Sequence, residues 1–168
     1  MKLSLFSAAP VLLLASSAAF ANLFRDGMAL VEETAAYLDG PGRQESKKLE
    51  RSAALAYATE SMRLTTRLMQ LASWLLLHRA VKEGEMTLSQ ANKEKSKVKL
   101  SVGEPGDPST IKLLPQRLRE LIDRSRKLND QVRRLDANIY APSIAPDQTP
   151  AISPVERQLG LLKAAFER

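Results

Sequence analysis

The chain has 168 residues, carries 25 basic and 19 acidic side chains for a net charge of +6, and contains no cysteine. Disulfides, thiolate catalysis and cysteine zinc sites are therefore excluded. Aromatic residues make up only 5% of the chain, which favours helices over a β-sandwich. A basic excess of this size is typical of a solvated helical surface, although binding to nucleic acid or to an anionic membrane stays open.

The first residues, MKLSLFSAAPVLLLASSAAFAN, have the layout of a secretory signal peptide. A basic Lys2 precedes an apolar stretch, and Ala19-Phe20-Ala21 offers a cleavage site. A mature chain starting at Asn22 would be an exported helical protein of the periplasm. No uninterrupted apolar run reaches the roughly 20 residues of a membrane span.

The apolar stripe of the first predicted helix starts before that cleavage site. Phe20 is followed at steps of three and four by Phe24, Gly27, Val31, Thr34 and Leu38. Cleavage after Ala21 would remove the first helical turn. We therefore predict a helix over Ser16–Leu38 and treat residues 1–15 as an apolar N-terminal extension, which argues against export.

The longest predicted helix runs over Arg43–Glu83, between the stop signal at Gly40-Pro41-Gly42 and Gly84. Its length of roughly 60 Å requires two neighbouring helices or a partner chain. The apolar stretch from Leu71 to Leu77 is either deeply buried or an association surface. The stripe that predicts its core face comprises Tyr57, Ser61, Leu64, Leu68, Leu71 and Leu75, and a second line comprises Met62, Met69 and Leu76, each seven residues apart.

Two further segments complete the predicted bundle, which ends at residue 141. Thr87 or Ser89 can cap a short helix running towards Lys97, and residues 101–108 form a turn-rich linker. The third long helix has the most regular repeat: Leu114, Leu118, Leu121, Ser125, Leu128, Val132, Leu135 and Ile139. Pro115 suits its first turn. This sustained period predicts long antiparallel helices packed at shallow angles.

The C-terminal part contains a linker and a short helix. Prolines recur every four residues over 142–154, which indicates an extended or disordered linker. Over 155–168, Val155, Leu159, Leu162 and Phe166 line one face of a predicted terminal helix. Such a tethered helix either docks on its own bundle or recognises a partner.

Catalytic chemistry is not predicted. The one histidine, His78, lies in the longest helix with no cysteine or second histidine to complete a metal site. No phosphate-binding glycine loop and no nucleophile elbow occur. Glu83 and Glu85, on either side of Gly84, are typical of a solvated helix end. The arginines of the third helix are interleaved with acidic residues, and no aromatic side chain stacks among them, which weakens the case for nucleic-acid binding.

Several stretches resemble one family. They are GMALVEETAAYLDGPGR (27–43), ALAYATESMRLTTRLMQLASWLLLHRAVKEGEMT (54–87), LLPQRLRELIDRS (113–125), VRRLD (132–136) and PVERQLGLLKAAF (154–166). In this order and spacing, they resemble the alphaproteobacterial family of regulators of CtrA degradation (RcdA). The likeness covers most of residues 20 to 166, which makes it much more specific than a short motif.

The resemblance implies a dimeric three-helix bundle without enzymatic activity or cofactor. It also implies an adaptor of the ClpXP protease, which helps deliver the cell-cycle response regulator CtrA and other substrates. By resemblance the partners are ClpX, CpdR, PopA and CtrA, and the location is the cytoplasm. We expect neither a nucleic acid nor a membrane as a partner. A flexible C-terminal region matters for delivery in this family. We expect partner contacts at Trp74, His78, Arg79 and Glu83, and on the terminal helix at Leu159, Leu162 and Phe166.

Overall fold

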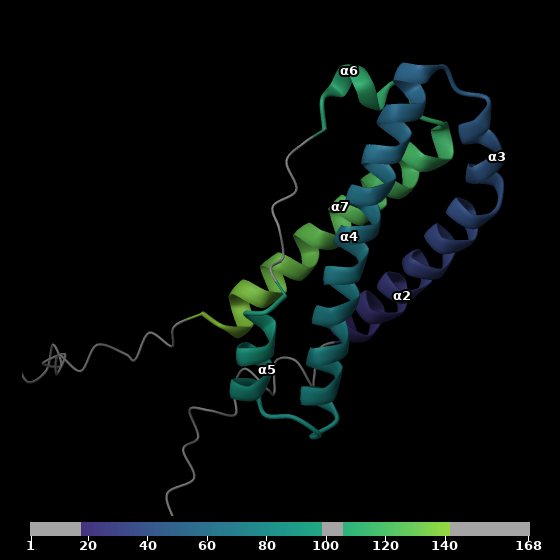
Figure 1. Ribbon diagram of the computed structural model, residues 1–168. Helices are drawn as coiled ribbons and strands as arrows, with labels where there is room; N and C mark the ends of the chain where they lie inside the picture. Colours follow the sequence, from purple (N-terminus) through teal and green to yellow (C-terminus); the bar gives the residue numbers. More distant parts are fainter. Residues whose placement is uncertain (1–17, 99–105, 142–168) are drawn as a thin grey trace, which may run out of the picture.

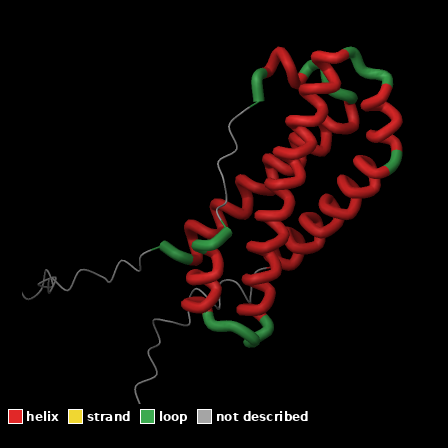
Figure 2. The backbone as a smooth tube through the Cα atoms, in the orientation of Figure 1, coloured by secondary structure: helices red, strands yellow, loops and turns green. Residues whose placement is uncertain are grey.

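Every regular element in the described part of the chain is a helix (Figure 2). The computed structural model describes residues 18–98 and 106–141. The helices are α2 (Ala18–Asp39), α3 (Pro41–Lys47), α4 (Arg51–Lys82), α5 (Leu88–Lys95), α6 (Pro108–Ile111) and α7 (Gln116–Ile139). The three long ones, α2, α4 and α7, each pack on the other two, which confirms the predicted all-α three-helix bundle (Figure 1).

Some predicted segments lie outside the described residues: the extension at 1–15, the linker at 142–154 and the terminal helix at 155–168. Among the helices that are described, none is both long and apolar enough to cross a membrane.

The three long helices do not all alternate in direction. The prediction of antiparallel packing holds for α2 against each of the other two, whereas α4 and α7 run the same way (Figure 1). Arg67 bonds to Ser125, Trp74 to Asp136, and His78 to Tyr140, so the partners on both helices advance together. Residues 83–115 therefore carry the chain back along the bundle before α7 begins.

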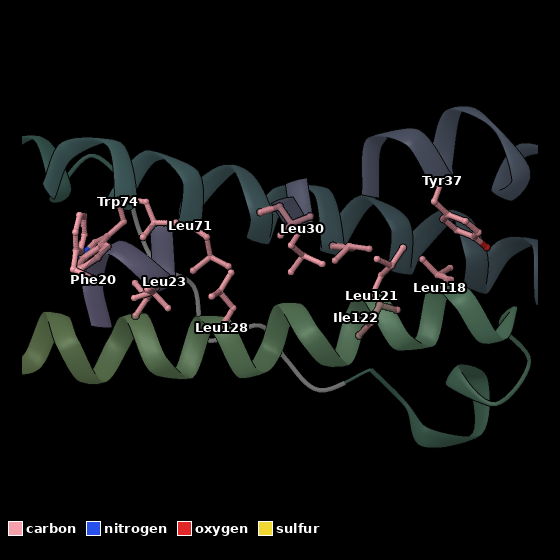
Figure 3. Packing of buried hydrophobic residues seen from close by; sticks show 14 of the residues in the cluster. Phe20, Leu23, Leu30, Tyr37, Leu71, Trp74, Leu118, Leu121, Ile122 and Leu128 are labelled. Carbon is pink, nitrogen blue, oxygen red and sulfur yellow. The ribbon is translucent and has the colours of Figure 1, made fainter. Parts of the chain in front are cut away.

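The core lies where the apolar stripes of α2, α4 and α7 meet (Figure 3). The predicted repeat of α7 is confirmed, since all of its members except the partly buried Leu135 are buried. Ser125, the one polar member, accepts a hydrogen bond from Arg67 at 2.8 Å and donates one to the Ile122 carbonyl at 2.7 Å. Gly27 lets α2 approach closely, because an added Cβ would come within 2.5 Å of Leu75.

The prediction of a single long helix over Arg43–Glu83 is wrong. The chain forms α3, bends, and then starts α4 at Arg51. Neither proline nor glycine causes the bend, so local sequence signals do not reveal it. Tertiary packing holds α3 against α2 instead: Tyr37 Oη donates to Glu45 Oε2 at 2.7 Å, and Gly42 lies against Tyr37 so closely that an added Cβ would come within 2.8 Å of that ring.

The shorter elements follow local capping signals. Of the two predicted caps, Thr87 is the one used, in a capping box with Gln90. Pro115 lies at the N-cap of α7, one position before its first turn. Of the linker predicted over 101–108, residues 101–105 lie outside the described residues. Its last residue, Pro108, starts the short helix α6, which is capped by the Asp107 side chain.

Substitutions in the core test the packing of α4 on α7. Leu68→Ala and Leu128→Ala each remove a buried side chain that the bundle cannot refill, so we expect each to lower the free energy of unfolding by about 2–5 kcal/mol. Leu113→Ala is the matched control, because Leu113 is 46% exposed; its effect should stay below about 1 kcal/mol. Urea unfolding followed by circular dichroism measures all three, and equal effects would contradict this core.

Candidate functional site

Trp74 and His78, two of the predicted contact residues, stack on each other inside the bundle. Their ring centroids lie 3.9 Å apart at an interplanar angle of 18°. Trp74 also lies 6.3 Å from Phe20 of α2, and its Nε1 donates to Asp136 Oδ1 of α7 at 2.9 Å. Trp74 is 1% exposed and His78 is fully covered. The pair therefore joins three helices, and any interaction role for it is indirect.

Two hydrogen bonds fix the tautomer of His78. Nδ1 lies 2.8 Å from the Trp74 carbonyl oxygen, which only accepts, so Nδ1 carries the proton. Nε2 then accepts from Tyr140 Oη, 2.8 Å away. Both ring nitrogens of the neutral imidazole are thus used in structural bonds, and neither is free to bind a metal or accept a substrate proton.

A partly buried ion pair between Lys95 and Asp136 completes this end of the bundle. Lys95 of α5 donates from Nζ to both carboxylate oxygens of Asp136, at 2.9 and 3.0 Å. The same ammonium lies 3.8 Å from the centroid of the Tyr140 ring, a cation–π contact. We name Trp74, His78, Lys95, Asp136 and Tyr140 the α4–α5–α7 cluster. It anchors the short helix α5 to the parallel pair α4 and α7.

Arg79 and Glu83 differ from Trp74 and His78 because they are exposed. Arg79 Nε donates to Glu83 Oε1 at 2.9 Å, and its guanidinium carbon lies 4.9 Å from the centroid of the Phe24 ring. These contacts hold an exposed arginine in place at the C-terminal end of α4. The other predicted contact residues, Leu159, Leu162 and Phe166, lie outside the described residues.

Two of the α7 arginines form ion pairs with α2. Glu33 of α2 accepts from Arg117 and, at 2.6 Å, from Arg124. Arg67 is buried between α4 and α7, where burial and the nearby Arg126 lower its pKa. Over residues 18–98 and 106–141, no three histidine or acidic side chains gather in a way that could hold a metal ion.

Sequence reasoning missed three members of the α4–α5–α7 cluster: Lys95, Asp136 and Tyr140. Tyr140 follows the last apolar position of the α7 repeat, and that place next to Ile139 was the only local signal for it. Lys95 stands in a row of alternating lysines with nothing to distinguish it from its neighbours. The cluster depends on the parallel course of α4 and α7, which a repeat pattern does not specify.

Burial determines the titration behaviour of this cluster. It lowers the pKa of His78 below the ordinary histidine value, because the charged imidazole would lose its hydration. Burial and the neighbouring Asp136 raise the pKa of Tyr140 to about 12. Both groups are therefore neutral near pH 7, in agreement with the hydrogen bond from the tyrosine hydroxyl to the imidazole.

We expect the bundle to lose stability as the pH falls below about 6.5, the pKa of an unperturbed histidine. Below that pH the unfolded chain binds a proton at His78 that the folded chain does not bind, so unfolding becomes more favourable by up to about 1.4 kcal/mol per pH unit. The loss ends once the pH reaches the lowered pKa of the folded state.

Urea unfolding between pH 7.5 and 5.5 measures this slope. His78 is the one histidine of the chain, so His78→Gln is a direct control and should remove the slope in this range. The same slope in the parent chain and the variant would show that the pKa of His78 is the same in the folded and the unfolded state.

Comparisons with protein-family models and with solved structures both give matches. A family model described as a protein of unknown function (DUF1465) matches residues 13–166. The crystal structure of RcdA from Caulobacter crescentus CB15 is similar with 53% sequence identity and a TM-score of 0.64, over 77% of this chain and 98% of the RcdA chain. A comparison with curated proteins gave no match. The match to almost the whole of RcdA, together with the shared helical bundle, shows that this chain belongs to the RcdA family.

Proposed function

We propose that this protein is a non-enzymatic adaptor of the ClpXP protease that helps deliver CtrA and other substrates for degradation. The observation that carries the proposal is the 53% identity to RcdA over 98% of the RcdA chain. At this identity over nearly the whole RcdA chain, the fold is retained, and we propose that the function is retained with it. ClpX, CpdR, PopA and CtrA are the proposed partners, and the active form is a homodimer.

The geometry of the α4–α5–α7 cluster supports a role without catalysis. Its one imidazole is neutral, buried and hydrogen-bonded through both nitrogens. Its carboxylate, Asp136, is bonded to Lys95 and Trp74. A catalytic base needs a lone pair directed at a substrate proton. These side chains instead hold the end of the bundle rigid, as a docking scaffold requires.

Exposed side chains near this end supply candidate contact points. Arg79 is exposed and held by Glu83 and Phe24, and arginine is among the residues most often found in the energetic centre of protein interfaces. The tethered apolar segment with Leu159, Leu162 and Phe166 provides the second candidate, through insertion into a groove of a partner.

The packing of Phe20 supports a cytoplasmic location. Phe20 is 2% exposed and contacts Trp74, and Lys82 Nζ lies 5.8 Å from the centroid of its ring. Cleavage after Ala21 would cut within α2 and remove this core side chain. The alternative, an exported protein of the periplasm, rests on the signal-like composition of residues 1–21.

Fractionation with intact-mass measurement separates these two locations. We expect a cytoplasmic product in which Phe20 and the residues before Asn22 are retained, because the bundle uses Phe20. Phe20→Ala is the companion variant, and it should lower the free energy of unfolding by about 3–5 kcal/mol. A periplasmic product that starts at Asn22 would contradict the adaptor proposal, since its proposed partners are cytoplasmic.

CtrA turnover and a pull-down test the adaptor role. Deleting the gene should lengthen the half-life of CtrA, and the restored chain should shorten it again and bind ClpX and CpdR. A triple variant with Leu159→Ala, Leu162→Ala and Phe166→Ala should fail to restore turnover while its melting temperature stays that of the parent. Leu113→Ala, an exposed change on the bundle, is the control and should restore turnover. Unchanged CtrA turnover in the deletion strain, with no ClpX contact, would rule the proposal out.

A further inference from the structure

Arg67 is a buried arginine that pairs with no carboxylate among the described residues. It is 7% exposed between α4 and α7, and its one hydrogen bond within that part of the chain runs from Nη1 to Ser125 Oγ at 2.8 Å. A guanidinium has five N–H donors and keeps its charge in proteins. Burial removes the hydration of that charge, so a buried arginine normally has an acidic partner. Arg117 and Arg124, which are more exposed, share the carboxylate of Glu33 on α2.

The side chains around Arg67 add positive charge. Arg63 stands about one turn before it on α4, and Arg126 follows Ser125 on α7. Burial lowers the pKa of Arg67 most, Arg126 lowers it further, and Glu60 raises it by less than Arg126 lowers it. The carboxylate of Glu60 already accepts from Arg63, at 2.8 Å. Arg126 is partly buried and forms no ion pair with the acids of the described residues, so this part of the bundle has an excess of positive charge.

A second arginine with an unused donor lies on the same side of α7. Arg119 stands seven residues before Arg126, which places both on one face of the helix. Its Nε is buried and has no hydrogen-bond partner within residues 18–98 and 106–141. Asp123 and Asp130, the acids that follow each of these arginines by four residues, are exposed and pair with neither. Buried N–H donors between α4 and α7 are thus left without an acceptor, which is uncommon in folded proteins.

We propose that Arg63, Arg67 and Arg126 form a binding site for a carboxylate carried by an acidic segment of a protein partner. We call these three residues the α4–α7 arginine site. Two oxygens of a carboxylate match the fork of donors on a guanidinium. Ser125 holds one nitrogen of Arg67 in place, which leaves the other donors for the ligand. The bound carboxylate supplies the negative charge that the surroundings of Arg67 lack.

The residues near the α4–α7 arginine site favour an acidic protein segment over a nucleic acid. Neither residues 60–73 of α4 nor residues 116–135 of α7 include an aromatic side chain, so bases would have no stacking surface there. Asp123 and Asp130 would repel a continuous phosphate backbone. A protein segment can present one or two carboxylates to Arg67 and keep its remaining side chains away from these aspartates.

Binding of a fluorescein-labelled hexaglutamate peptide to the full chain, followed by fluorescence anisotropy, tests the proposal. At low ionic strength, where charges are screened least, we expect saturable binding of this peptide and none of hexaglutamine. Arg126→Gln should raise the dissociation constant by about 10-fold or more, because it removes charge-assisted hydrogen bonds. Arg134→Gln is the matched control, since Arg134 is exposed on the same helix and its loss removes the same charge. This variant should stay within about 2-fold of the parent.

Three results of the peptide titration would overturn the proposal. The first is a parent chain that does not bind hexaglutamate. The second is an equal loss of affinity in Arg126→Gln and Arg134→Gln, which would assign binding to the net charge of the chain. The third is tighter binding of hexathymidylate than of hexaglutamate, with its affinity reduced by Arg126→Gln, which would assign the site to a nucleic acid.

Arg67→Met separates ligand binding from folding. Methionine fills part of the same space without a charge, so the melting temperature of the variant should equal or exceed that of the parent. Its affinity for hexaglutamate should fall by about 10-fold or more. Unchanged peptide binding in Arg67→Met would show that Arg67 serves the fold alone and would overturn the proposal. If this variant does not fold, the comparison of Arg126→Gln with Arg134→Gln decides the result. The experiment uses the purified chain and a peptide, so its failure leaves the proposed delivery of CtrA unaffected.

Discussion

The structure depends on the position of α4, a helix of 32 residues that touches every other described helix. Its inner face buries Leu64, Leu71 and Leu75 against α2 and α7. Because α2 and α7 pack against one side of a continuous helix, α4 keeps a solvent-facing side along its whole length. The bundle thus has a closed core, and the side of α4 that carries Leu55, Met62, Met69 and Leu76 faces solvent.

The parallel course of α4 and α7 is the second constraint, because residues 83–115 must return along the bundle. The α4–α5–α7 cluster is placed where this return begins. Trp74 and His78 stack within α4, and Tyr140 bonds to His78 from the end of α7. Lys95 ties α5 to Asp136 and Tyr140. The cluster joins the start of the return segment to the end of the last helix, next to Ala141, the last described residue.

The sequence predicted the class of fold and the three main stripes, because a long apolar repeat is a local property. The repeat from Leu114 to Ile139 is an example, as is the cap at Thr87. It could not predict the break between α3 and α4, which packing of Tyr37 and Gly42 imposes. The burial of Trp74 and His78 was likewise unspecified, because an apolar stretch suits a core and an association surface equally. The line of Met62, Met69 and Leu76 was visible as a repeat, but only the structure places it on the solvent side.

The central claim, substrate delivery, is tested most directly with purified components. The measurement is the initial rate of CtrA degradation by ClpXP with CpdR and PopA, with and without this chain. The account predicts that adding the chain accelerates CtrA loss and that the triple change at Leu159, Leu162 and Phe166 removes the acceleration. A rate that is the same with and without the chain would contradict the account.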